Sequence, residues 1–488
     1  MDRLPGADAM TGRDRYESPL GSRYASPAMQ RLWSPQHRAG VWRRLWLELA
    51  EAERALGIEI PGEALEQMRA HLDDADLDAI RKHEQLMRHD VMAHIRHFGD
   101  QAPAARAYLH LGATSAFVTD NTDLIVQREA LRILLGRLAT VIRTLDDFAL
   151  RYKALPTLAY THFQPAQLTT VGKRATLWLQ DLLLDAEALL ALVATLPFRG
   201  CKGTTGTQAS YLELFAGDHD KVRELDRLVT SAFDFGVSIP VSGQTYTRKI
   251  DSRVVDALSG IAQSVSKFAT DLRLLQHERE VLEPAEREQV GSSAMAYKRN
   301  PMRAERICAL ARYVLSLQEN AHYTAATQWL ERTLDDSANR RLALPETFLT
   351  TDATLVLSIN VVAGLEVQEA VIRRNVDREM PFMATERWLM LGVQAGGDRQ
   401  SLHEVIRRLS SEVATVVAEG GANDLVERLA TDPAFASLDT ATLRAELDPA
   451  YYVGRAPEQV LEFIDGPVAQ LRRSLEPYET QEEVLVTV

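Results

Sequence analysis

Cysteine is almost absent from this chain of 488 residues, which contains only Cys201 and Cys308, far apart in the sequence. So few thiols argue against a disulfide framework and against a zinc site built from cysteines. Aromatic residues are also few, at 7%, whereas the hydrophobic share of 46% is ordinary for a soluble globular protein. The length allows several domains, or one large core with appendages.

Positive charge is in deficit, because 55 Lys and Arg residues stand against 68 Asp and Glu residues, for a formal net charge of −13. This balance argues against a protein that binds nucleic acid by general electrostatic attraction. An anionic small-molecule substrate would therefore need local clusters of arginine. The sequence also lacks a nucleotide-type glycine loop, an internal repeat and a low-complexity tract.

Long uninterrupted apolar runs are missing as well. The N-terminus is polar and has no apolar signal segment. The most apolar long stretch, 177–196, is broken by polar and charged residues, which predicts a buried helix rather than a membrane span. The interrupting residues are Gln180, Asp181, Asp185 and Glu187. We therefore expect a protein of the reducing cytoplasm with no membrane partner.

Apolar residues recur at helical spacing through the middle of the chain. A seven-residue repeat is formed by Leu124, Leu131, Leu138 and Leu145, and similar seams occupy 254–275, 307–317 and the segment after Leu355. This spacing predicts long helices with a narrow apolar stripe, suited to nearly parallel packing in a bundle. No comparable strand alternation recurs, so the expected fold class is all-α. Helices this long are expected to pair many of their seams across subunits.

The same pattern divides the chain into three expected domains. Residues 1–114 contain shorter, highly charged helices, and residues 115–367 contain the long-helix bundle. Residues 368–488 return to shorter helices, broken at Pro381, Gly396-Gly397 and Pro433.

The segment Gly291–Pro301 reads G-S-S-A-M-A-Y-K-R-N-P and has neither helical nor strand periodicity. We expect a mobile surface loop between a helix ending near Glu283 and one beginning after Pro301. A serine acts as a base only if its alkoxide is stabilised, and Lys298 offers a nearby positive charge. A solvated Ser/Gly linker is the alternative for an isolated Gly-Ser-Ser.

The whole string resembles the signature loop of the fumarase/aspartase superfamily, G-S-S-x-M-P-x-K-x-N-P, whose members eliminate fumarate by breaking a C–N or C–O bond. The resemblance implies that Ser292 is the base that removes a Cβ proton. It also implies that Lys298, Asn300 and loop N–H groups stabilise the anion that forms. The chain departs from the pattern at Ala296, where proline is usual. This change should make the loop more flexible without removing a catalytic atom.

The string T-H-F-Q-P-A-Q begins at Thr161, shortly after Pro156 interrupts a helix. A lone histidine is more often structural than catalytic, but here neighbouring Thr and Gln residues can fix its tautomer. The string is similar to the segment that carries the general acid in adenylosuccinate lyases. The resemblance implies that His162 protonates the leaving nitrogen, that Thr161 binds substrate, and that Glu305 holds the proton on His162. An ordinary salt bridge in the first turn of a helix is the alternative for Glu305.

The string R-H-D-V-M-A-H contains His89 and His94, and His97 follows it. Three histidines this close together could form a metal site. Flanking arginines and the lack of cysteine or a regular carboxylate set argue against it. The string resembles the segment of adenylosuccinate lyases that contacts phosphate and assists catalysis. This implies a catalytic role for His89 and substrate contacts for Arg88 and Asp90.

Three further strings follow the same family. H-L-G-A-T-S ends in Thr114 and Ser115, which can donate to a carboxylate or phosphate or, alternatively, cap the next helix. S-G-Q-T-Y-T-R-K supplies Gln244 as a nucleotide contact. E-R-T-L-D-D-S-A-N-R-R supplies Arg332, Ser337 and Arg341, since arginine forks suit phosphate and carboxylate. A self-paired charge run, neutralised by its own Glu and Asp residues, is the alternative for this last string.

The resemblance extends from about residue 18 to 455 and is greatest to the animal-type adenylosuccinate lyases. It implies a three-domain fumarase/aspartase-like fold whose bundle forms the core of a homotetramer with shared active sites. The implied substrates are adenylosuccinate and the succinylated imidazole-carboxamide intermediate SAICAR, the implied products are AMP, AICAR and fumarate, and no metal or organic cofactor is needed. The residues implied to hold the nucleotide are Arg23, Tyr24, Arg88, Gln244, Arg306, Arg332, Ser337 and Arg341. Argininosuccinate lyase and a non-enzymatic, lens-type or scaffold protein on the same fold remain alternatives.

Overall fold

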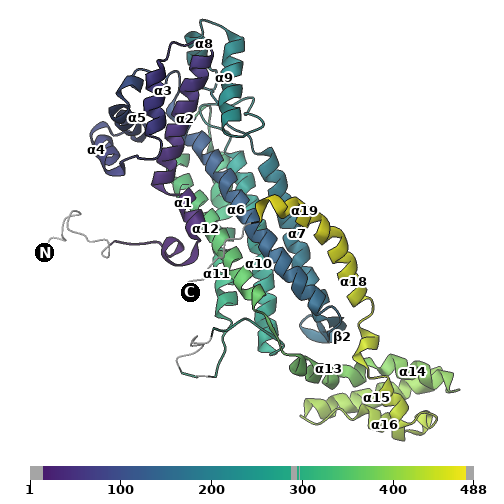
Figure 1. Cartoon of the computed structure of the whole chain (residues 1–488). Helices are drawn as coiled ribbons and strands as arrows, with labels where there is room; N and C mark the ends of the chain where they lie inside the picture. The colour runs from purple at the N-terminus through teal and green to yellow at the C-terminus, as the bar shows by residue number, and fades with distance from the viewer. Residues whose placement is uncertain (1–14, 287–293, 296, 480–488) are drawn as a thin grey trace.

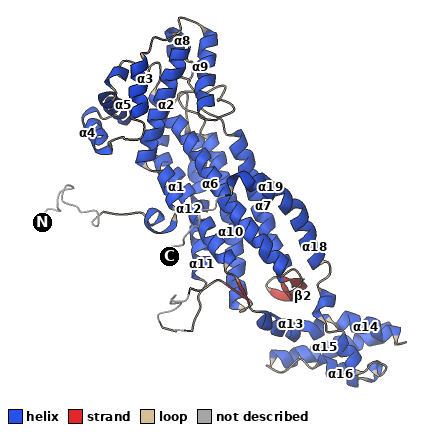
Figure 2. Cartoon of the chain, viewed as in Figure 1, coloured by secondary structure: helices blue, strands red, loops and turns tan. Residues whose placement is uncertain are grey.

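The computed structural model describes residues 15–286, 294–295 and 297–479. Figure 1 shows an elongated molecule in which a bundle of long helices joins N-terminal helices at one end to C-terminal helices at the other. Helices dominate, and strands lie at the C-terminal end of the bundle (Figure 2). Among the described residues the named strands form two sheets of two strands each, so the expected all-α class is confirmed.

The bundle consists of α6 (Ser115–Arg151), α7 (Val171–Thr195), α10 (Lys249–His277), α11 (Met302–Thr327) and α12 (Asp335–Ala363). The N-terminal end holds α1 (Pro27–Leu32), α2 (Pro35–Ala55), α3 (Gly62–Ala70), α4 (Leu77–Met87), α5 (Asp90–Gln101), α8 (Ala209–Leu214) and α9 (His219–Ala232). The C-terminal end holds α13 (Glu369–Met383), α14 (Thr385–Gln394), α15 (Arg399–Ala418), α16 (Leu425–Thr431) and α17 (Thr440–Ala445), after which come α18 (Ala456–Phe463) and α19 (Ala469–Leu475). The strands are β1 (Pro156–Thr161), β2 (Gln164–Thr170), β3 (Val281–Leu282) and β4 (Glu366–Val367).

The predicted leucine seam lies inside the bundle. Its members Leu124, Leu131, Leu138 and Leu145 all belong to α6 and have 0% of their surface exposed. Along its length α6 packs against α7 and α12, while α10 packs against α11 and α12. Complete burial of one leucine side chain contributes about 1.5–3 kcal/mol, so the repeat stabilises α6 over its full length.

Among the described helices, α12 is long and apolar enough to cross a membrane. In the structure 72% of that apolar window is buried inside the protein. A helix that is apolar on all sides also suits the centre of a bundle. The stretch 177–196, identified from the sequence as the most apolar, falls mainly in α7, where it is a helix with Leu177 and Leu184 exposed.

The predicted end of a helix near Glu283 is wrong, because α10 ends at His277. Arg279 adopts a left-handed conformation with φ of 60°, which stops the helix. The chain then forms β3, which pairs antiparallel with β4. Glu283 turns back instead to accept hydrogen bonds from the N–H groups of Arg303 (3.1 Å) and Ala304 (2.9 Å), at the start of α11.

The C-terminal helices have a hydrophobic core of their own. Trp388, Leu402 and Phe435 are central members of a cluster that spans Ala384 to Leu443. In contrast, α18 and α19 return to the bundle and pack against α7 and α6 (Figure 1). The domain boundaries at 114/115 and 367/368 remain predictions.

Glu53 of α2 is completely buried, and neither carboxylate oxygen has a hydrogen-bond partner among the described residues. Burial raises its pKa from 4.5 to about 9. Because the folded pKa exceeds the unfolded one, the free energy of unfolding is highest below pH 4.5 and falls as the pH rises toward 9. We expect Glu53→Gln to raise the free energy of unfolding by about 3 kcal/mol at pH 7. The free energy of unfolding of this variant should also depend less on pH.

Urea unfolding at pH 5 and pH 8 measures this effect, since the gain should be much smaller at pH 5. Glu66→Gln on the exposed face of α3 is the matched control. It should leave the free energy of unfolding unchanged at both pH 5 and pH 8. An equal gain at both pH values for Glu53→Gln would show that Glu53 is not held protonated by the fold.

Candidate active site

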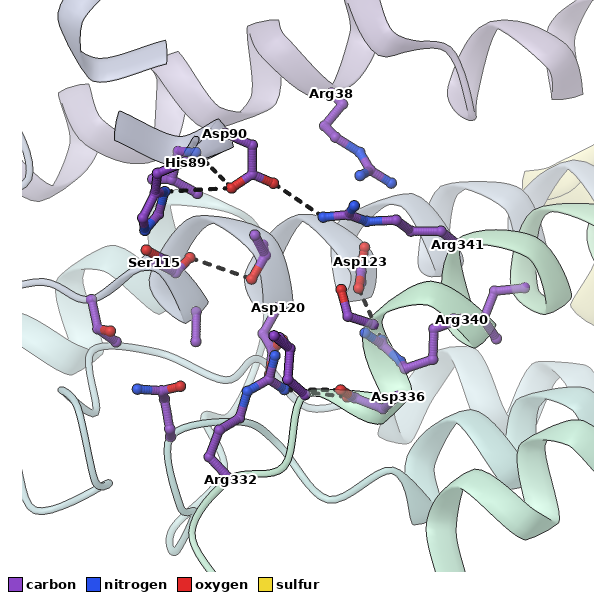
Figure 3. Close-up of a pocket in the computed structure, with 18 of the residues that line it drawn as sticks. Arg38, His89, Asp90, Ser115, Asp120, Asp123, Arg332, Asp336, Arg340 and Arg341 are labelled. Atoms are coloured by element: carbon purple, nitrogen blue, oxygen red, sulfur yellow. Dashed lines mark hydrogen bonds and ion pairs between the residues drawn. The ribbon is translucent and has the colours of Figure 1, made fainter. Parts of the chain in front are cut away.

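A cavity of about 650 Å³ opens where the bundle meets the N-terminal helices. The N-terminal ends of α5, α6 and α12 converge on it, together with the loop that contains Gln244 (Figure 3). Helix N-termini present free N–H groups and positive potential, so three of them favour an anionic ligand. The predicted site residues that line it, here called the cavity group, are Arg88, His89, Asp90, Thr114, Ser115, Gln244, Arg332, Ser337 and Arg341.

The start of α5 places the first part of the cavity group. Arg88 adopts a left-handed conformation with φ of 56° between α4 and α5. His89 caps α5, because its Nδ1 accepts a hydrogen bond from the N–H of Met92 at 3.4 Å. With Nδ1 as acceptor, a neutral His89 carries its proton on Nε2. Asp90 accepts from Nη2 of Arg341 at 3.0 Å, which joins α5 to α12 (Figure 3).

The other histidines near α5 do not converge on His89. His94 packs edge-on against Trp42, with ring centroids 4.6 Å apart. His97 accepts at Nε2 from the N–H of Asp76 at 3.2 Å. In the described part of the chain no group of three His, Cys, Asp or Glu residues is arranged to hold a metal ion.

Thr114 and Ser115 lie at the start of α6. Thr114 occupies the N-cap position, yet its side chain makes no capping hydrogen bond. The capping role that the sequence allowed for these residues is therefore not used by the Thr114 hydroxyl. Thr114 lines the cavity, as does Ser115.

Gln244 is held by its backbone from two sides. Its N–H donates to the carbonyl of Glu331 at 2.9 Å. Its carbonyl accepts from Nε (3.0 Å) and Nη2 (2.6 Å) of the buried Arg199. The preceding Gly243 is required here, because an added Cβ would lie only 2.6 Å from the carbonyl oxygen of Glu331.

The charged residues of 331–341, at the start of α12, form ion pairs only partly among themselves. Nη1 of Arg332 donates to both carboxylate oxygens of Asp336, at 3.1 and 3.3 Å. Asp335 accepts from the hydroxyl of Thr333 at 3.1 Å. Arg341 reaches across to Asp90. Ser337, the residue after Asp336, lines the same cavity.

A second set of predicted residues lies on a β-hairpin that the sequence analysis did not predict. Strands β1 and β2 pair antiparallel, and Thr161 faces Gln164. The turn between them is His162-Phe163, with φ of 52° and 58°. Such turns favour Asn-Gly, so two larger residues there store strain, which is concentrated at functional sites. We call Thr161 and His162 the hairpin group.

A third set lies around the start of α11. Here Lys298 is exposed and Glu305 lies in the first turn of the helix. Arg306 lies over the ring of Tyr24, 5.9 Å from its centroid. Arg299 pairs bidentately with Glu366 of β4 (2.8 Å for both contacts), which anchors this part of the chain. The loop group consists of Lys298, Asn300, Glu305, Arg306, Arg23 and Tyr24; Ser292 and Ala296 lie outside the described residues.

The cavity group is far from the other two groups in one chain. The 37 residues of α6 make it about 55 Å long, and it separates the cavity group from the hairpin group at its far end (Figure 1). The 26 residues of α11 make it about 39 Å long, and it separates the loop group from Arg332. In the described part of one chain, His162 therefore does not reach the cavity, and its pairing with Glu305 stays a prediction.

The chain matches the family described as Lyase over residues 51–316 and the family described as Adenylosuccinate lyase C-terminus over residues 381–463. It is 50% identical over 477 residues to adenylosuccinate lyase of Schizosaccharomyces pombe, which covers 97% of this chain and 99% of that protein. The chain belongs to the adenylosuccinate lyase family. Adenylosuccinate lyase of Saccharomyces cerevisiae is also 50% identical, over 98% of this chain and 100% of its own.

Solved structures of two other enzymes share the fold of this adenylosuccinate lyase family chain. The 3-carboxy-cis,cis-muconate lactonizing enzyme of Pseudomonas putida matches with a TM-score of 0.79 at 23% identity, covering 94% of this chain and 99% of that one. A fumarate lyase of Mesorhizobium sp. BNC1 matches with a TM-score of 0.77 at 24% identity. The match covers 91% of this chain and 99% of that one. At this identity the likeness establishes the fold alone.

Sequence reasoning assigned no role to several charged residues beneath the cavity of this family member, although Asp120 and Asp123 lie in a string, D-N-T-D, that resembles the family. They are Asp120, Asp123, Arg248 and Arg340, and Arg38 lines the same cavity from α2 (Figure 3). The available signal was a pair of carboxylates inside an otherwise apolar helix pattern, since buried charge is kept only where it is paired. This pattern indicates that Asp120 and Asp123 are buried and paired, but it does not predict which arginines pair with them.

Proposed function

We propose that this chain is an adenylosuccinate lyase, which eliminates fumarate from adenylosuccinate to give AMP and from SAICAR to give AICAR. The cavity carries this proposal: three helix N-termini together with Arg88, Arg332 and Arg341 line one space of about 650 Å³. That arrangement suits the phosphate and carboxylate groups of a succinylated nucleotide. The identity to adenylosuccinate lyases over nearly the whole chain supports the same substrate.

The elimination needs a base, an acid and stabilisation of an intermediate anion. Ser292 removes the Cβ proton of the succinyl group, and the electron pair left behind delocalises into the neighbouring carboxylate. Lys298 and Asn300 stabilise the resulting dianion. When the C–N bond breaks, its electron pair stays on the nitrogen, which takes a proton from His162. The strained turn that presents His162 at a hairpin tip supports this role.

The remaining predicted residues hold the substrate or tune the acid. Glu305 keeps His162 protonated, and His89 assists the proton transfer at the cavity rim. Substrate contacts are assigned to Arg23, Tyr24, Arg88, Asp90, Thr114, Ser115, Thr161, Gln244, Arg306, Arg332, Ser337 and Arg341. No metal or organic cofactor takes part in these steps.

The spacing of the three groups supports a homotetramer with shared active sites. Because α6 alone is about 55 Å long, the cavity group of one chain must receive His162 and the loop group from other chains. Exposed apolar side chains on the bundle helices support this packing; they include Leu177, Leu184, Leu274, Tyr313 and Leu342. We place the enzyme in the cytoplasm, with no nucleic-acid or membrane partner, in keeping with its net charge and buried apolar helices.

Fumarate release, followed by ultraviolet absorbance, tests the function directly. We expect turnover of adenylosuccinate and SAICAR and none of argininosuccinate. Light scattering should give a particle of four times the 54.4 kDa chain mass. Turnover of argininosuccinate alone would assign the chain to a sister lyase, and a tetramer without any turnover would make it a scaffold.

A further inference from the structure

A line of alternating buried charges lies directly beneath the cavity. Asp336, in the first turn of α12, has a side chain with 0% exposure. It accepts from Nη1 of Arg332 at 3.1 Å and from Nε of Arg248 at 2.7 Å. A carboxylate buried so completely between two guanidinium groups fixes both of them in place.

The line continues from Arg248 to the long helix α6. Nη2 and Nη1 of Arg248 donate to the two oxygens of Asp120, at 3.2 and 3.3 Å. Asp120 also accepts from the N–H of Tyr246 at 2.9 Å, in the loop that carries Gln244. Asp120, Arg248 and Asp336 therefore join the starts of α6 and α12 to this loop.

The charges in this line are maintained inside the protein. Burial acts to raise the pKa of Asp120, but Arg248, Arg340 and Arg199 outweigh it and hold that pKa below its ordinary value. Arg340 lies alongside and pairs with Asp251 (2.7 Å) and Asp123 (2.9 Å). Buried ion pairs contribute little net stability, so their retention fits a role in fixing geometry.

Arg332 is the member of the line that faces the cavity. In the described part of the chain, Asp336 accepts hydrogen bonds from Arg332 through the Nη1 group alone. The Arg332 side chain is 28% exposed. Nε and Nη2 are thereby left to form a fork toward a bound anion. The direction of that fork depends on the position of Asp336.

We propose that Asp336, held by Arg248 and Asp120, is a positioning residue that aims Arg332 at the anionic group of the substrate. The proposal rests on the proposed function, because Arg332 is assigned there to the nucleotide. Asp336 does not touch the substrate. It acts on the substrate through Arg332, while Arg248 and Asp120 hold Asp336 in place.

The variant Asp336→Asn tests this role. Asparagine keeps the size of the side chain but loses its charge and one of its acceptor oxygens. We expect KM for adenylosuccinate to rise on the order of 10- to 100-fold, since small misplacements of a binding group have effects of this size. The value of kcat should change by less than about threefold, because the interaction acts on binding rather than on the transition state alone. The affinity for AMP, measured by calorimetry without turnover, should fall in parallel.

Asp146→Asn is the matched control. Asp146 is also a buried carboxylate paired with an arginine, Arg472, at 2.8 Å, but it lies toward the opposite end of α6. Both variants should lose thermal stability, and only Asp336→Asn should weaken binding. Equal changes in KM for the two variants would assign Asp336 to general stability and overturn the proposal.

A double-mutant cycle separates positioning through Arg332 from any direct effect. In an Arg332→Gln background, Asp336→Asn should no longer raise KM, because the group that it positions has gone. Additive effects would overturn the proposal, while turnover by the unaltered enzyme would still support the proposed function. Should Asp336→Asn not fold, Arg248→Lys keeps the buried positive charge but not the fork. It should raise KM about tenfold, and an unchanged KM would contradict the proposal.

Discussion

Replacing either Ser292 or His162 with alanine is expected to lower kcat roughly 10³-fold while the chain still folds and assembles. Ser292→Ala removes the proposed base for the Cβ proton, and His162→Ala removes the proposed acid for the leaving nitrogen. The two steps act on one substrate, so loss of either group stops the elimination. Fumarate release measures turnover, and circular dichroism and light scattering check the fold and the assembly.

Each substitution has a conservative control. Ser293→Ala alters the neighbouring serine of the pair and should keep substantial activity. His162→Asn removes the acid but retains a residue that tolerates the left-handed conformation of the turn. It should be as inactive as His162→Ala. If His162→Asn turned over normally, the acid would have to be another residue and the strain at the hairpin tip would have another purpose.

Mixing the two inactive variants is expected to restore activity. A chain with Ser292→Ala still carries His162, and a chain with His162→Ala still carries Ser292. We propose that the base and the acid of one site come from different chains, in keeping with the shared active sites that the resemblance implies. In random 1:1 mixed tetramers, about a quarter of the sites would combine a native Ser292 with a native His162.

Unfolding the two variants together in urea, refolding them and measuring fumarate release tests this expectation. Each variant unfolded and refolded alone is the control and should stay inactive. Activity near a quarter of the native value supports sites shared between chains. An inactive mixture that contains mixed tetramers would place the base and acid of each site in the same chain.

The long helices could be predicted from the sequence because their signal is local and repeated. Leucines at seven-residue intervals report the buried face of α6 directly, and the structure places them at 0% exposure. The hairpin was missed because its strands are short and its turn, His162-Phe163, lacks the Asn or Gly that marks such turns. The end of α10 was missed because a single backbone angle, at Arg279, decides it.

The candidate site was predictable in its residues but not in its arrangement. Resemblance named the nine members of the cavity group that line one space, yet it gave no distances between them and the hairpin. The pairing of Asp336 with Arg248 links positions far apart in the chain, and nothing in either local string specifies it. Paired charges of this kind become visible only when the fold brings distant segments together.

The length of α6 also bears on how the enzyme behaves at different protein concentrations. A catalyst whose site lies within one chain has the same specific activity at any dilution. Here the cavity and His162 are held apart by a rigid helix, so a dissociated chain keeps its fold and its nucleotide cavity but has no acid beside the substrate. Below the dissociation constant of the tetramer, the rate would therefore fall more steeply than in proportion to the enzyme present. Chains freed by dilution would also lack the loop group of their neighbours, so nucleotide binding would weaken along with catalysis.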